Sequence, residues 1–139
     1  MDRATYGMRD ASFSTSKALP NGASTVYSSA LDLGELPVQG ARHEPCEAEI
    51  SAPALATGEL GDADTMKYDV QTATEPTFAS PTTIAKEVLV QTGAGGVGAA
   101  AAKCRQKIAT TSQRYIRVAA TNSAAGDCSG KTFGVALLF

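Results

Sequence analysis

The sequence predicts an all-β protein, an antiparallel β-sandwich or jelly roll of about eight strands, forming one domain over residues 1–139. Three observations support this prediction. Several segments alternate apolar and polar residues with the period of two that a half-buried strand requires. Short clusters of Gly, Pro, Asn and Ser separate these segments. Only the alanine-rich stretch Ala99 to Lys103 has a helix-like composition. Many short strands joined by turns are typical of sandwiches and jelly rolls.

The strand candidates follow one another along the chain. The clearest is 66–71, where the apolar Met66, Tyr68 and Val70 alternate with polar residues, and 48–52 alternates in the same way. Residues 1–11 precede the first candidate, and we expect them to form an N-terminal arm. The remaining candidates are Ser12–Ser16, Thr25–Ser28, Ala30–Leu33, Lys86–Gln91, Arg114–Val118 and Thr132–Phe139.

Composition and charge exclude several classes of function. The net charge is −2, and the basic residues are scattered rather than gathered into a run that could follow a phosphate backbone, so nucleic-acid binding is not expected. The first residues lack the pattern of a secretory signal, and no apolar stretch is long enough to span a bilayer. We therefore expect a protein made in the cytoplasm that binds no membrane. Aromatic residues are only 6% of the chain and Trp is absent, which predicts a thin core and favours self-association.

Glycines 93, 95 and 98 have the spacing G-x-G-x-x-G and directly follow the apolar run Val88–Val90. This order is typical of a dinucleotide-binding turn, which needs a strand–helix–strand unit and an acidic residue about 20 positions further on. Here no acidic residue occurs before Asp127, and only 41 residues (99–139) follow Gly98. We therefore expect no cofactor, and interpret the glycines as a flexible or short-helical connection between two strands.

The sequence offers little catalytic or metal-binding chemistry. His43 is the only histidine, and its spacing to Cys46 permits a Cys–His dyad or, with Cys104 and Cys128, a mixed zinc site. Three widely spaced cysteines are more simply free thiols in a reducing compartment, and His43 a loop residue.

The remaining polar motifs are also incomplete. No G-x-S-x-G sequence presents a nucleophilic serine. Asp62 and Asp64 resemble half of a calcium loop but lack its other ligands, so a solvated turn is expected. We expect no catalytic, cofactor or metal site, and no enzyme.

Four short motifs point to a family. A strand ending in Gln71-Thr72 leads into a polar loop and then into Phe78-Ala79-Ser80-Pro81. Further motifs are Asp32-Leu33-Gly34 upstream and Arg114-Tyr115-Ile116-Arg117 downstream, the latter followed by a polar turn and a last apolar strand. Together they resemble the jelly-roll capsid cement (decoration) proteins of tailed bacteriophages, loosely over 25–36 and better over 65–139. Residues 38–61 and 93–102 have no counterpart in this resemblance.

The resemblance implies a non-enzymatic virion protein, usually a homotrimer, on the outer surface of the expanded head where major capsid subunits meet. Its partners would be the major capsid protein and copies of itself. A tail-associated or glycan-binding β-sandwich domain is the alternative, although the absence of Trp counts against it. Each candidate contact below can also be ordinary core. The candidates are Tyr6, Met8 and Phe13 for the capsid, and Leu137, Leu138 and Phe139 for the trimer.

Overall fold

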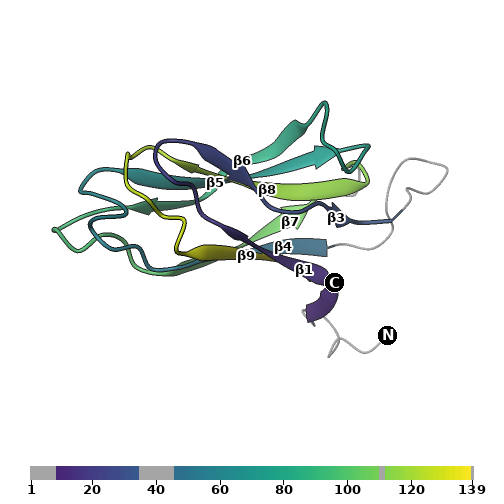
Figure 1. Cartoon of the computed structure of the whole chain (residues 1–139). Coiled ribbons are helices and arrows are strands. Elements are labelled where there is room, and N and C mark those ends of the chain that lie inside the picture. The colour runs from purple at the N-terminus through teal and green to yellow at the C-terminus, as the bar shows by residue number, and fades with distance from the viewer. Residues whose placement is uncertain (1–8, 35–45, 110–111, 139) are drawn as a thin grey trace.

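The computed structural model describes residues 9–34, 46–109 and 112–138, with side chains of the first strand from Phe13 onward. These residues form nine strands in two layered antiparallel sheets, without a helix, so the predicted fold class is confirmed (Figure 1). One sheet has the order β1-β9-β4-β7; the other has the order β2-β8-β5-β6, with β3 also paired to β8. The strands are β1 Arg9–Ala18, β2 Thr25–Tyr27, β3 Leu31–Asp32, β4 Cys46–Ala52, β5 Thr65–Ala73, β6 Thr82–Thr92, β7 Ala102–Ile108, β8 Tyr115–Asn122 and β9 Thr132–Leu138.

Eight of the nine strands overlap a predicted segment, and the exception is β7. The helix-like interpretation of Ala99 to Lys103 is wrong: Ala99 bridges to Leu55, and β7 pairs with the whole of β4, from Ala52 opposite Ala102 to Cys46 opposite Ile108. Alanine, lysine, arginine and glutamine favour helices in isolation. Pairing with β4 overrides this preference because it satisfies the backbone of a segment whose exposed and less exposed residues alternate.

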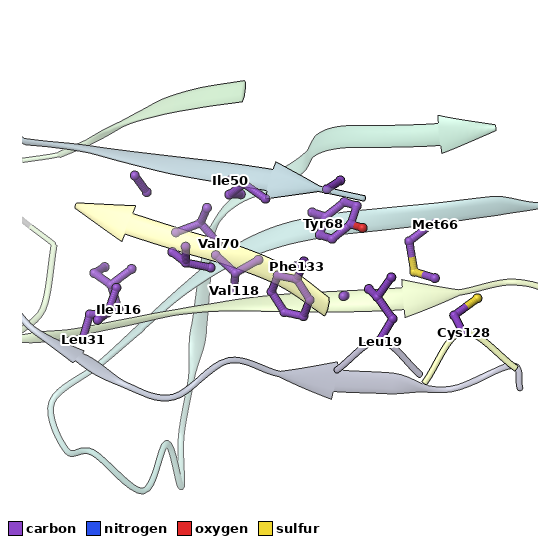
Figure 2. Packing of buried hydrophobic residues seen from close by; sticks show 14 of the residues in the cluster. Leu19, Leu31, Ile50, Met66, Tyr68, Val70, Ile116, Val118, Cys128 and Phe133 are labelled. Atoms are coloured by element: carbon purple, nitrogen blue, oxygen red, sulfur yellow. The ribbon is translucent and has the colours of Figure 1, made fainter. Parts of the chain in front are cut away.

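The hydrophobic core fills the space between the sheets. Tyr68 of β5 and Phe133 of β9 pack edge to face, with ring centroids 5.6 Å apart. Val70 and Val118 come from one sheet and Ile50 from the other, all within the same buried cluster (Figure 2). Each fully buried large apolar side chain contributes about 1.5–3 kcal/mol. The apolar residues of the alternating segment 66–71 therefore form the face of β5 that packs into the core.

A buried glutamine links the core to the connecting loops. The Gln91 side chain of β6 accepts a hydrogen bond from the Tyr68 hydroxyl (3.1 Å) and donates to the carbonyls of Pro53 (2.8 Å) and Ala100 (2.9 Å). Pro53 follows β4, and Ala100 precedes β7. The Gln91 side chain thus joins β6 to the segment after β4 and to the segment before β7. Burial raises the pKa of the Tyr68 hydroxyl well above its ordinary value.

Strand β6 lies at the edge of its sheet, and its pairing with β5 is irregular. Tyr68 pairs with Leu89 and Val70 with Ala85, so three residues of β6 lie opposite Asp69 alone. The middle one, Glu87, has a φ of +51°. Its backbone N–H donates to the Asp69 carboxylate (2.6 Å), and its carboxylate pairs with Lys67 (2.6 Å). The irregularity is a bulge that locally bends the edge strand.

Candidate functional site: an arginine stack on the outer face of the second sheet

The central feature of the outer face of sheet β2-β8-β5-β6 is the Arg117 side chain. In β8, Ile116 and Val118 point into the core, so Arg117 points outward. Its guanidinium carbon lies 3.8 Å from the ring centroid of Tyr27 on β2 and 4.3 Å from that of Phe78, in the β5–β6 connection. Both contacts are within the range of a cation–π interaction.

A neighbouring strand fixes the orientation of this guanidinium. The Arg117 Nε–H donates to Gln71 Oε1 at 2.8 Å, and Gln71 of β5 lies directly opposite Arg117 in the antiparallel register. Below the side chains lies Ala119, which faces the same way and is only 3% exposed. We call Tyr27, Gln71, Phe78 and Arg117 the arginine stack, a group packed closely onto the sheet.

Phe78 adopts a backbone conformation that is unusual for a residue with a bulky side chain. Its φ is +51°, a left-handed conformation that costs a bulky residue roughly 1–2 kcal/mol. The side chain is 5% exposed, yet it lies outside the cluster that forms the core between the sheets. Packing against Arg117 and the sheet offsets the strain, so the conformation serves the outer face.

A second arginine, Arg114, directly precedes β8 and forms a bidentate ion pair. Arg114 donates from Nε and Nη2 to the two carboxylate oxygens of Asp32, at 2.8 and 2.9 Å, and lies 5.3 Å from the ring centroid of Tyr115. Asp32 Oδ1 also accepts a hydrogen bond from the Gly34 N–H (2.8 Å). This bidentate pair fastens the short strand β3 to β8.

Burial is the main influence on the pKa of the Arg117 guanidinium. Desolvation lowers this pKa, while the nearby Tyr27 acts in the opposite direction. An arginine keeps its proton throughout the physiological range even so. The arginine stack therefore presents a permanent cation in contact with two aromatic rings.

Three of the six predicted contact residues are described, and they lie on β1 and β9 of the other sheet. Phe13, in β1, is half-buried and packs against the core cluster. Leu137 lies inside that cluster, and Leu138 is also buried within the single chain. Tyr6, Met8 and Phe139 fall outside the described residues. The capsid and trimer roles of these residues stay predictions.

The glycine-rich motif connects two strands, as predicted, but the second of them is the unpredicted β7, and the connection contains no helix. A Cβ at Gly93 would lie 2.0 Å from the carbonyl oxygen of Gly61, and one at Gly98 would lie 2.0 Å from that of Leu55. Gly98 also has a φ of +77°. The glycines thus allow two connections, 93–101 and 53–64, to pack backbone against backbone.

The residues considered for metal or thiol chemistry are dispersed. Cys46 in β4 and Cys128 before β9 are buried, whereas Cys104 in β7 is half-buried. Burial raises the pKa of the Cys104 and Cys128 thiols. His43 is not among the described residues. Within the described ranges, no three or more His, Cys, Asp or Glu side chains gather as a metal site would require.

The two acidic residues of the turn that was expected to be solvated have a local structural role. Asp62 Oδ1 accepts a hydrogen bond from the Gly96 N–H at 2.9 Å, and the backbone carbonyl of Asp64 accepts one from the Gly93 N–H at 3.0 Å. This bond adds to the contact between the two connections.

Across 9–34, 46–109 and 112–138, no helix is long and apolar enough to cross a membrane.

The arginine stack was not identified from the sequence as a site. Gln71, Phe78 and Arg117 belong to the motifs quoted for the family resemblance, and this was the available signal. Nothing in the sequence links Tyr27 to Arg117, because their contact depends on β2 pairing with β8.

Comparisons with known proteins give low similarity. No protein-family model matches the sequence, and none of the curated proteins does. The chain is similar to TmCBM27, a carbohydrate-binding module that recognises mannan, with 13% identity, a TM-score of 0.48 and coverage of 87% of this chain and 68% of the other. It is also similar to the CBM32 of AlyQ, solved in complex with 4,5-unsaturated mannuronic acid, with 17% identity, a TM-score of 0.38 and coverage of 97% and 92%.

A third similar chain comes from the structure of infectious bursal disease virus Gt strain. The identity is 12%, the TM-score is 0.38, and the alignment covers 96% of this chain and 29% of the viral one. At such identities and TM-scores, a likeness concerns the β-sandwich architecture and does not indicate what this chain binds.

Proposed function

We propose that this chain is a non-enzymatic structural protein of a virion, a capsid cement protein that binds the outer surface of an expanded phage head and stabilises the lattice of the major capsid protein. One observation carries the proposal: of the four motifs that resemble the cement family, the one from Arg114 to Arg117 contacts each of the other three. Asp32 binds Arg114, while Gln71 and Phe78 both contact Arg117.

This contact network gives the resemblance more weight than its separate motifs have. Each motif is short, and any one of them can occur by chance. Residues that lie side by side on β3, β8, β5 and the following loop instead form one three-dimensional unit, whose members depend on each other for position. The outer face of sheet β2-β8-β5-β6 is accordingly the surface that we propose for docking.

The stabilising mechanism is thermodynamic linkage. A ligand that binds only the assembled, expanded lattice stabilises it by about 4 kcal/mol per site at a thousandfold excess over Kd. A homotrimer that contacts several capsid subunits adds avidity, because its second and third contacts form at a high effective concentration. In the proposed virion this contribution counteracts the pressure of the packaged DNA.

Co-sedimentation tests the proposal directly. Purified protein is mixed with undecorated expanded heads and with unexpanded shells of the phage that encodes it, and the bound amount is measured at saturation. We expect saturable binding to expanded heads only, with a fixed number of copies per head. Absence of binding to expanded heads would exclude the cement function.

A glycan-binding or tail-associated β-domain is the second candidate. The observation in its favour is Tyr27, which is 41% exposed and contacts the Arg117 guanidinium, itself hydrogen-bonded to Gln71. An aromatic ring flanked by hydrogen-bonding groups is suited to a sugar. Affinity electrophoresis in gels containing neutral and acidic polysaccharides separates the candidates, because only a glycan-binding domain is retarded.

A further inference from the structure

The guanidinium of Arg117 has most of its hydrogen-bonding capacity unused. A guanidinium carries five N–H donors. In Arg117 the Nε–H donates to Gln71, and no acceptor for the Nη1 and Nη2 donors is found in the described part of the chain. Arg114 is the contrast, because both its Nε and its Nη2 donate to Asp32.

The same guanidinium is already immobilised and partly dehydrated. The rings of Tyr27 and Phe78 both contact it, and Gln71 accepts a hydrogen bond from Nε. These contacts displace part of its hydration and leave the Nη1 and Nη2 donors available. A guanidinium held in this way loses little conformational entropy when it binds an anion. It is also weakly hydrated compared with an ammonium group, so its desolvation costs less.

A strained residue maintains this arrangement. Phe78 keeps its left-handed backbone at φ +51° although it contributes to the outer face rather than to the core between the sheets. Strain of this kind often accompanies a preorganised binding site. The strained backbone of Phe78 and the unused Nη donors are independent observations, and both concern the Arg117 guanidinium.

We propose that Arg117 binds a carboxylate of the protein on which this chain docks, with Nη1 and Nη2 donating to its two oxygens. The geometry of a carboxylate matches two parallel N–H donors, and its single charge balances that of Arg117. That the carboxylate belongs to an Asp or Glu side chain of a protein rests on the proposed function. The arginine stack then acts as a preformed receptor in the docking surface.

The test uses the full chain and a defined probe. A hexaglutamate peptide is titrated into ¹⁵N-labelled protein, and the Nε–Hε resonance of Arg117 is followed by NMR together with the ring signals of Tyr27. We expect saturable shifts in the wild type. Arg117→Lys keeps the charge but loses the fork, so binding should weaken by roughly tenfold. The matched control is Arg105→Lys on the opposite sheet, which should leave binding unchanged.

A second variant tests the arginine stack without replacing Arg117 itself. Tyr27→Leu removes one stacking ring from an exposed position and retains Arg117, so binding should again weaken. The proposal is overturned by equal binding in wild type and Arg117→Lys, or by no saturable shift in the wild type. A response to oligogalacturonate without one to the peptide also overturns it, because the site then belongs to an acidic glycan.

Parallel sedimentation with expanded heads separates this inference from the proposed function. If the wild type binds the peptide but not heads, the cement function fails and a carboxylate site remains. If heads bind wild type and Arg117→Lys equally while the peptide does not bind, the cement function stands and the inference fails.

Discussion

Gly98 provides the strongest test of how the two connections are packed. We predict that Gly98→Ala destabilises the protein far more than an ordinary loop substitution. The added methyl group would lie 2.0 Å from the Leu55 carbonyl oxygen, with Ala56 backbone atoms also closer than 3.0 Å. All three atoms belong to the backbone of Leu55 and Ala56, so no side-chain rotation relieves the clash.

The expected magnitude combines strain with lost interactions. Alanine at a φ of +77° costs roughly 1–2 kcal/mol. Moving the two segments apart breaks the reciprocal hydrogen bonds between Leu55 and Ala99, of 2.9 and 2.8 Å, each worth about 0.5–1.5 kcal/mol. It also begins to expose the Leu55 side chain, now 2% exposed. We expect a total of about 3–5 kcal/mol.

Urea unfolding followed by far-ultraviolet circular dichroism measures this loss. The control is Gly95→Ala in the same loop, since Gly95 also has a positive φ, +65°, but nothing lies within 4 Å of its added Cβ. The control should lose only about 1–2 kcal/mol. Equal destabilisation by the two substitutions would refute the argument, because close backbone approach would then not be the reason for glycine at 98.

Three further predictions concern the core and the thiols. Gln91→Leu should destabilise the fold by about 1–3 kcal/mol in urea titrations, because the buried Tyr68 hydroxyl and the partly buried carbonyls of Pro53 and Ala100 lose their partner; a neutral result would contradict the bridging role. Burial raises the pKa of Tyr68 above its ordinary 10.0, so the unfolded state releases this proton first and stability should fall as pH rises above about 10. Tyr68→Phe should flatten that decline, and an unchanged slope would show that other groups cause it. Iodoacetamide should modify the half-buried Cys104 of the native protein well before the buried Cys128, as mass spectrometry of digests can show; faster modification of Cys128 would contradict its burial.

Strand β5 illustrates what the sequence alone reveals. Its strict alternation reports that one face is buried, and the structure places Met66, Tyr68 and Val70 in the core. Strand β7 was missed because its residue types favour helices in isolation. Its pairing with β4 is a long-range interaction that local composition does not encode.

The arginine stack could be predicted only in part. Gln71 and Arg117 stood out through the family resemblance, but their contact depends on the register of β5 and β8. Tyr27 joins them through a different strand pairing. The left-handed backbone of Phe78 has no signal in its sequence, since glycine and asparagine are the usual indicators of such a conformation.

The bulge in β6 has a consequence for solubility at high concentration. An open, regular edge strand is a template on which further chains can add and grow into fibrils. In β6 the bulge around Glu87 and a second register shift between Ala85 and Thr83 interrupt the pairing with β5, and the Lys67–Glu87 pair places charge at the bulge. A second chain cannot extend such an edge as one continuous strand. The interrupted edge therefore disfavours polymerisation through β6, although Ile84 and Val90 are exposed there.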